Sequence, residues 1–189
     1  MNENIFEAVK TLRAGGVVAH ATETCYGLAA DIFMKSAIQK LYALKKMSRD
    51  KPVSILLRSF DEAQEYAEFS PLALQLALKY WPGPLTLVLP AKPIVPNWIN
   101  AGNATVGIRV SSNAMTRKLL EAFGGGITTT SANISGMPPA YCVQDFLDQK
   151  LLPDFILDSG KIGAHLPSTI VEVTGCEYRV IRQGGLKIG

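Results

Sequence analysis

Residues 13–24, RAGGVVAHATET, contain the unit from which we infer the fold: the end of a helix, a short strand and a polar loop. Gly15-Gly16 ends the predicted helix, because glycine readily adopts the left-handed backbone conformation that is common beyond helix C-termini. Residues 17–21 are mostly apolar and begin with two β-branched valines, as is typical of a buried strand. Thr22-Glu23-Thr24 then places polar groups directly after the strand.

The same alternation of helical and strand patterns continues along the chain. Asn2 or Asn4 can cap the first helix, and further helices are predicted at about 35–45, 61–67, 71–80 and 113–123. Strands are predicted at 17–21, 53–57, 85–89, 106–109, 127–130, 155–158, 168–173 and 178–182. Residues 81–84, WPGP, predict a rigid turn, and Gly175 predicts an antiparallel hairpin. This order predicts an α/β fold with a mixed sheet and flanking helices, in a single domain spanning residues 1–189.

Composition and charge narrow the class of protein. The 189 residues are 48% hydrophobic and carry a net charge of +3, which permits a polyanionic partner without demanding one. The three cysteines are an odd number, and the N-terminal sequence lacks the apolar core of a signal peptide. No apolar run approaches the roughly 20 residues of a membrane helix. We therefore expect a soluble cytoplasmic protein without a membrane partner.

Several common kinds of active site are not indicated by the sequence. It contains neither a G-x-x-x-x-G-K-[ST] phosphate loop nor a G-x-G-x-x-G motif after a strand. His20 and His165 have no ligand-spaced Cys or His partners, so we interpret both as structural side chains rather than zinc ligands. Cys25 has no recognisable base near it in the sequence, which favours packing over a role as a nucleophile.

Hydroxyl, amide and basic residues cluster at the ends of the predicted strands. The clusters are Thr22–Thr24, Thr128–Asn133 with Ser135, Ser168-Thr169, and the strand-terminal Arg109 and Arg182, with Lys45 at a helix end. Each cluster alone is also explained by the strand preference of threonine or by turn chemistry. Ligands of α/β sheets, however, bind beyond strand ends, and hydroxyl, backbone N–H and arginine groups bind phosphates and carboxylates. Together the clusters predict a site for a phosphorylated or carboxylated small molecule.

Six motifs in a fixed order resemble the signature stretches of the YrdC-like family. They are TETCYGL at 22–28, WPGPLT at 81–86, TVGIR at 105–109, TSANISG at 130–136, STI at 168–170 and RQG at 182–184. WPGP together with TSAN is a specific pair, and the resemblance spans nearly the whole chain. It implies a twisted sheet with a large concave basic surface. It also implies L-threonylcarbamoyladenylate synthase activity, a nucleotidyltransferase reaction that makes threonylcarbamoyl-AMP and pyrophosphate from L-threonine, bicarbonate or CO2, and ATP with Mg²⁺.

The resemblance also implies roles for individual residues. Thr22, Arg109, Thr129 and Ser168 would bind threonine and its carbamate, with Arg109 facing the carboxylate. Lys45, Thr105, Ser131 and Arg182 would bind ATP, and Asn133 would orient the same loop or contact a phosphate. A carbamate oxygen attacks the α-phosphorus without any protein nucleophile, so positioning and charge are what the protein supplies, with Lys45 and Arg109 the most critical residues. The metal ligands are not indicated, because Mg²⁺ often binds mainly phosphates and water.

The chain departs from the family pattern at the segment before residue 53. Family members commonly carry Lys-x-Arg there, whereas this chain has Lys45, Lys46 and Met47, followed by Arg49. We therefore expect Arg49 to reach the ATP phosphates from a shifted loop. His20-Ala21 likewise stands where an aromatic–proline pair is usual.

Other functions remain open at this point. The main alternative is an RNA-binding protein of the same fold, with tRNA or double-stranded RNA as its partner and no synthase activity; a different carbamoyl or adenylyl transfer is a third reading. For the synthase, the product would serve the threonylcarbamoyladenosine modification of tRNA, so separate transfer proteins would act downstream.

Overall fold

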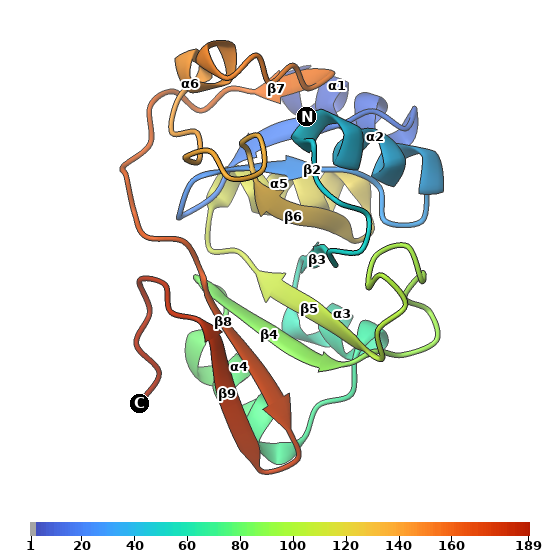
Figure 1. Cartoon of the computed structure of the whole chain (residues 1–189), viewed down its shortest axis with the longest axis vertical. Helices are drawn as coiled ribbons and strands as arrows, with labels where there is room; N and C mark the ends of the chain where they lie inside the picture. Colours follow the sequence, from blue (N-terminus) through green and yellow to red (C-terminus); the bar gives the residue numbers. More distant parts are fainter. Residues whose placement is uncertain (1–2) are drawn as a thin grey trace.

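The computed structural model describes residues 3–189 and shows helices packed on a curved, twisted sheet (Figure 1). The helices are α1 (Glu3–Arg13), α2 (Lys35–Lys45), α3 (Phe60–Tyr66), α4 (Pro71–Tyr80), α5 (Ala114–Phe123) and α6 (Val143–Asp148). The strands are β1 (Val18–Ala21), β2 (Tyr26–Ala29), β3 (Ser54–Leu57), β4 (Leu85–Pro90), β5 (Thr105–Val110), β6 (Ile127–Ser131), β7 (Phe155–Leu157), β8 (Thr169–Thr174) and β9 (Glu177–Arg182). Asn2, one of the two predicted caps, lies outside the described residues, and Asn4, the other, lies inside α1 rather than before it.

The strands form one sheet in the order β7-β1-β2-β6-β3-β5-β4-β8-β9. The pairs β1–β7, β3–β5 and β4–β8 are parallel and the other neighbouring pairs are antiparallel, which confirms the predicted mixed sheet. β8 and β9 form the predicted antiparallel hairpin, in which Gly175 has a φ of +60°. That backbone region is readily available to glycine, which explains the residue at this turn.

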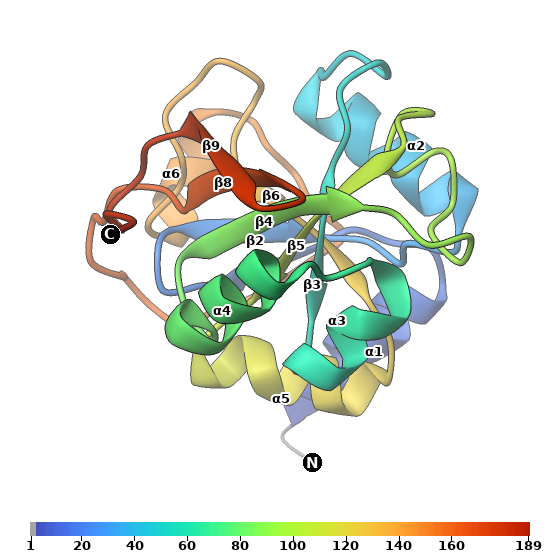
Figure 2. The ribbon, with the colours of Figure 1, turned by 90° about the horizontal axis from the view of Figure 1, so that it is seen from below.

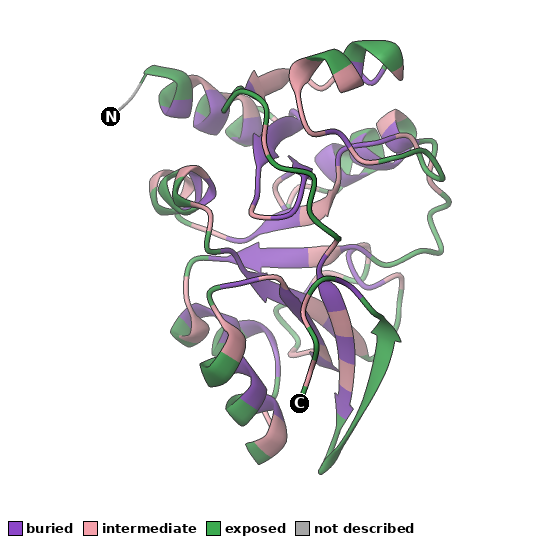
Figure 3. Ribbon diagram, turned by 90° about the vertical axis from the view of Figure 1, so that its left-hand side faces the viewer, coloured by how far each residue is buried: buried purple, intermediate pink, exposed green. Residues whose placement is uncertain are grey.

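The helices are distributed unevenly over the two faces of the sheet. α1, α5, α3 and α4 lie along one face, whereas α2 and α6 lie on the other side (Figure 2). In the α1–α5 layer, Ile5, Val9 and Leu12 of α1 are buried in one cluster with Leu119 and Leu120 of α5. On the side opposite the α1–α5 layer, Figure 3 shows long loop segments that are largely exposed.

Local sequence signals explain the boundaries of several helices. The Asn113 side chain accepts hydrogen bonds from the backbone N–H groups of Met115 and Thr116, and so caps α5 as its position predicts. The Ser70 side chain caps α4, and Pro71 occupies the first turn, where its missing N–H costs nothing. Among the described residues, no helix is long and apolar enough to cross a membrane.

Two elements are absent from the sequence prediction. β2 has four residues and is held by pairing with β1 on one side and β6 on the other, so its strand character comes from long-range partners. α6 has six residues and only Phe146 fully buried, which is too short for a helical apolar pattern to be recognised. The other predicted elements agree with the structure to within two residues at either end where a boundary was given.

Candidate functional site

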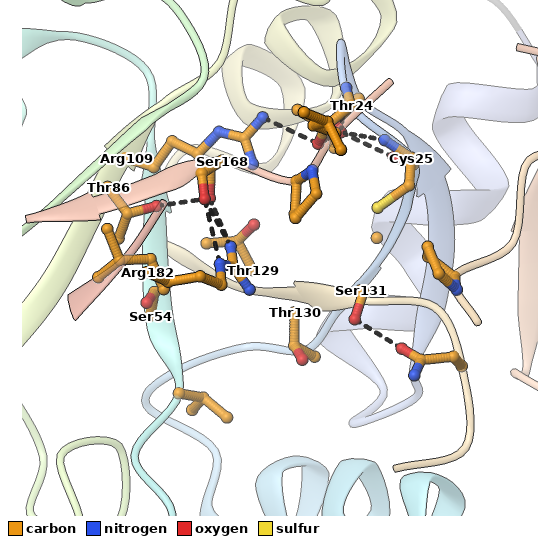
Figure 4. Close-up of a pocket in the computed structure, with 18 of the residues that line it drawn as sticks. Thr24, Cys25, Ser54, Thr86, Arg109, Thr129, Thr130, Ser131, Ser168 and Arg182 are labelled. Carbon is orange, nitrogen blue, oxygen red and sulfur yellow. Dashed lines mark hydrogen bonds between the residues drawn. The ribbon is translucent and has the colours of Figure 1, made fainter. Parts of the chain in front are cut away.

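A cavity of about 480 Å³ lies where strand ends and loops from both halves of the sheet converge (Figure 4). Its polar wall contains hydroxyl groups of Thr22, Thr129 and Ser168 and the guanidinium groups of Arg109 and Arg182. No carboxylate is among the residues that line it. The volume falls within the roughly 300–1,000 Å³ of ordinary small-molecule sites, and the charge of the wall suits an anionic ligand.

The loop after β1 forms a tight turn organised by the Thr22 hydroxyl. Thr22 Oγ1 donates to the Cys25 carbonyl at 2.7 Å and accepts from the backbone N–H of Thr24 at 3.1 Å. The Thr22 N–H donates to the same Cys25 carbonyl at 3.1 Å. The polar cluster predicted after residue 21 is thus a β1–β2 hairpin turn, and its Thr22 and Thr24 line the cavity.

Arg109 lies near the end of β5 and is tied to this turn. Its Nη2 donates to Thr24 Oγ1 at 3.3 Å and lies 2.8 Å from Glu23 Oε1. The side chain is 6% exposed, so its charge acts with little screening by water. Burial alone would raise the pKa of Glu23, but the Arg109 guanidinium and the Ser111 hydroxyl outweigh it and hold the pKa below its usual value.

Arg182 and Ser168 form a second cluster on the opposite wall. Arg182 Nη2 donates to the Ser168 carbonyl at 2.8 Å and to Ser168 Oγ at 3.0 Å, and Ser168 Oγ lies 3.1 Å from Thr86 Oγ1 (Figure 4). Gly184 makes this arrangement possible, because a Cβ atom there would lie 2.0 Å from the Pro167 carbonyl oxygen. The RQG stretch at 182–184 is therefore constrained by close backbone approach as well as by charge.

Lys45 holds the loop after β6 in place through hydrogen bonds from its side chain. Its Nζ donates to the carbonyls of Ser131 and Asn133 and to Asn133 Oδ1, the last two at 2.9 and 3.3 Å. Ser131 Oγ donates to Asn133 Oδ1 at 2.6 Å, which orders the loop further. Burial lowers the pKa of Lys45 to about 8, so the ammonium is still mostly charged at neutral pH. The three donors of Lys45 therefore all bind loop oxygens in this structure.

The structure brings seven of the predicted site residues together on the cavity. They are Thr22, Arg109, Thr129, Ser131, Asn133, Ser168 and Arg182. Lys45 contacts Ser131 and Asn133 but is not among the lining residues.

Besides Lys45, two further predicted ATP-binding residues do not line the cavity. Thr105 begins β5, four residues before Arg109, and an extended strand separates such positions by roughly 13 Å. Arg49 is exposed on the loop after α2, and Met47 lines the cavity instead. The expected shift of Arg49 into the position of the usual arginine is thus absent from this structure. A slip of two residues on an irregular loop changes which way a side chain points, so spacing alone could not decide it.

Other residues that line the cavity were not predicted as site residues from the sequence. Ser54, Thr86 and Tyr141 line the cavity from β3, β4 and the segment before α6. A weak signal existed for the first two, since each is a hydroxyl residue in an otherwise apolar strand stretch, SILL or LTLV. Tyr141 carried no such signal, because its segment has no regular pattern.

Cys25 and His20 are buried, as their structural interpretation predicts, but Cys25 also lines the cavity, as does the exposed His165. Cys25 is buried, and burial raises the pKa of its thiol, which disfavours the nucleophilic thiolate. His20 is fully buried, with Nδ1 2.9 Å from Thr116 Oγ1, and burial lowers its pKa to about 4. Among the described residues, no group of three or more His, Cys, Asp or Glu side chains is placed to hold a metal ion.

Comparison with known proteins gives a consistent family assignment. The Sua5/YciO/YrdC family model, described as "Telomere recombination", matches residues 10–184. A Vibrio cholerae protein named threonylcarbamoyl-AMP synthase is 36% identical over 186 residues, which cover 96% of this chain and 98% of that protein.

Solved structures agree with this assignment. The Pyrococcus abyssi Sua5 structure in complex with L-threonine has a TM-score of 0.89 at 34% identity, covering 96% of this chain and 54% of that one. Escherichia coli YciO has a TM-score of 0.85 at 26% identity, covering 95% of this chain and 88% of that one. This chain therefore corresponds to about half of the Pyrococcus protein and to most of the bacterial ones. It belongs to the Sua5/YciO/YrdC family.

Proposed function

We propose that this protein is an L-threonylcarbamoyladenylate synthase, which makes threonylcarbamoyl-AMP and pyrophosphate from L-threonine, bicarbonate or CO2, and ATP. The observation that carries the proposal is that Arg109 and Arg182 share one cavity with a wall of hydroxyl groups. The reaction joins two anions, a carbamate and a triphosphate, so a site with two guanidinium groups and no lining carboxylate offsets their repulsion. The names of the relatives support the same reaction.

The proposed chemistry needs no protein nucleophile. The threonine amine combines with CO2 to give a carbamate and a proton, and a carbamate oxygen then attacks the α-phosphorus of ATP. One P–O bond forms to the carbamate, and the bond to the β-phosphate bridging oxygen breaks as pyrophosphate leaves. Thr22, Arg109, Thr129 and Ser168 would hold the threonine carbamate, which leaves Arg182 for the nucleotide phosphates.

Lys45, Ser131 and Asn133 would act at the nucleotide end of the site. Ser131 and Asn133 line the cavity, and Lys45 donates to both, so we propose that Lys45 shapes their loop for ATP. We propose that Mg²⁺ arrives as the complex with the ATP phosphates. Among the described residues, no group of three or more His, Cys, Asp or Glu side chains is placed to hold Mg²⁺. We therefore assign the ion neither a protein ligand nor a step of the reaction.

Release of pyrophosphate from ATP, measured while threonine or bicarbonate is omitted in turn, tests the synthase. We expect release only when both are present, a product mass equal to threonylcarbamoyl-AMP, and a loss of about 100-fold or more in kcat/KM for Arg109→Ala. Release without threonine would indicate a different transfer reaction. No release by folded protein that binds tRNA with a steep dependence on salt would favour an RNA-binding protein.

For the synthase, the product carries an activated carbamoyl group. We infer that separate proteins transfer that group to tRNA adenosine, as the final step of threonylcarbamoyladenosine formation. A role in tRNA modification would place the enzyme in the cytoplasm.

A further inference from the structure

Glu23 and Arg109 form an ion pair that joins the β1–β2 turn to β5. Glu23 Oε1 lies 2.8 Å from Arg109 Nη2, and the two side chains are only 17% and 6% exposed. A pair this well shielded from water is much stronger than a surface pair, because solvent screens it little. Glu23 itself is not among the residues that line the cavity, whereas Arg109 is.

The second oxygen of Glu23 is held by Ser111. Ser111 Oγ donates to Glu23 Oε2 and accepts from the backbone N–H of Asn113 at 3.2 Å. Ser111 is fully buried and directly follows β5, and its side chain contacts the same carboxylate as that of Arg109. One carboxylate oxygen, Oε2, thus accepts a hydrogen bond from Ser111, while Oε1 is in ion-pair contact with the guanidinium without an aligned hydrogen bond among the described residues.

This fixed carboxylate orients the guanidinium group of Arg109. Nη2 is occupied by Glu23 and by Thr24 Oγ1, whereas the buried Nε has no hydrogen-bond partner among the described residues. A buried donor without a partner is costly unless something else satisfies it, and an arginine can bind a carboxylate through two parallel N–H groups. Nη2 is therefore held by two partners, while Nε has none among the described residues.

We propose that Glu23, held by Ser111, is a positioning residue that fixes the Arg109 guanidinium for the carboxylate of the amino-acid substrate. This role deepens the proposed synthase function and rests on it. Glu23 makes no contact with the substrate in this scheme and acts only through Arg109. A neutral side chain at position 23 would leave the guanidinium free to turn, so binding of the amino acid would weaken while binding of ATP would not.

The kinetic test compares Glu23→Gln, which keeps the shape but removes the charge, with Glu65→Gln, an exposed control on α3. We expect Glu23→Gln to raise KM for L-threonine by about tenfold or more, with KM for ATP changed less than about twofold. Ser111→Ala should raise KM for L-threonine by a smaller factor. Ser112 is the exposed neighbour of Ser111, and Ser112→Ala should leave KM for L-threonine unchanged. Equal increases in both KM values, or no increase for threonine, would overturn the proposal.

A double-mutant cycle separates positioning from general damage to the fold. In an Arg109→Lys background the guanidinium is absent, so Glu23→Gln should add less than about threefold to KM for threonine. Full additivity of the two changes would show that Glu23 acts by some other route.

A readout that does not depend on catalysis keeps this inference distinct from the proposed function. The Arg109 Nε proton, assigned by its loss in Arg109→Lys, should exchange slowly with water in the wild type and at least about tenfold faster in Glu23→Gln. If the wild type shows no threonine-dependent turnover, the proposed function fails while this measurement still tests the orientation of Arg109. Unchanged exchange in Glu23→Gln would reject the positioning role.

Discussion

At the scale of single residues, His20 is a fully buried imidazole whose protonation state is coupled to folding. Thr116 Oγ1 donates to the Ala21 carbonyl, so it accepts from His20 Nδ1, and the other nitrogen, Nε2, has no partner among the described residues. A Cβ atom at Gly27 would lie 3.2 Å from that nitrogen, so the glycine allows the backbone of β2 to approach the imidazole closely. Burial accordingly lowers the pKa of His20 to about 4 from 6.5.

This pKa shift predicts a loss of stability in mild acid. Between pH 6.5 and 4 the unfolded chain binds a proton at His20 and the folded chain does not, so the free energy of unfolding decreases as pH falls. A difference of about 2.5 pKa units corresponds to roughly 3 kcal/mol. His20→Asn, which keeps a donor for Thr116, should show a correspondingly shallower decrease in urea denaturation over this range.

The exposed His165 supplies the matched control for that measurement. His165→Asn should follow the wild-type stability curve, because the His165 side chain is exposed and its replacement removes no buried group. Carboxyl groups such as those of Glu23 and Asp154, whose pKa values are lowered in the fold, also destabilise the protein in acid, and both variants retain them. Parallel curves for His20→Asn and the wild type would contradict the prediction.

At the scale of elements, the end of β9 is packed against the start of β8 through a glycine. The Gly184 N–H donates to Thr169 Oγ1 at 3.0 Å, and the backbone of residues 167–169 lies too close for any Cβ atom. We predict that Gly184→Ala lowers the free energy of unfolding by about 2 kcal/mol or more, since backbone cannot yield as a flexible side chain can. It should also lower kcat/KM, because Ser168 and Arg182 flank the contact.

Gly185→Ala is the control for this element. A Cβ atom there would lie 3.5 Å from Leu166 Cβ, an ordinary contact. Chemical denaturation of the two variants side by side is the measurement, and equal stability of Gly184→Ala and Gly185→Ala would show that the close approach is easily relieved.

At the scale of the whole molecule, the cavity is lined by both halves of the sheet. Thr22 and Thr129 belong to the β1–β2–β6 half, whereas Arg109, Ser168 and Arg182 belong to the β5–β4–β8–β9 half (Figure 1). A ligand that contacts both halves binds the folded chain and not the unfolded one. At about 100 times its Kd it should stabilise the fold by about 2.7 kcal/mol, or roughly 5–10 °C in Tm.

Thermal unfolding with L-threonine and with ATP checks this expectation. Each ligand should raise Tm for the wild type, and Arg109→Ala should lose the shift caused by threonine while keeping most of the shift caused by ATP. Identical loss of both shifts would mean that the two ligands do not occupy separable parts of the cavity.

Much of the fold follows from local sequence patterns. The range predicted for α4 and the Gly175 hairpin agree with the structure, because each depends on neighbours within a few residues. The polar strand ends are also a local feature, and placing them at one site needs only the rule that strand ends meet at a sheet edge. The seven cavity residues were identifiable for that reason, together with the family motifs.

The remaining features depend on contacts between distant segments. β2 is a strand because β1 and β6 pair with it, and Glu23 lies beside Arg109 because a turn and a strand 86 positions apart meet. Met47 rather than Arg49 lines the cavity because an irregular loop, which has no period, sets the direction of each side chain. The sequence by itself thus determined the elements and the chemical character of the site. Only the tertiary structure decided which charged side chains face the cavity and which neighbouring side chains hold them in place. Both depend on packing between segments that are distant in the sequence.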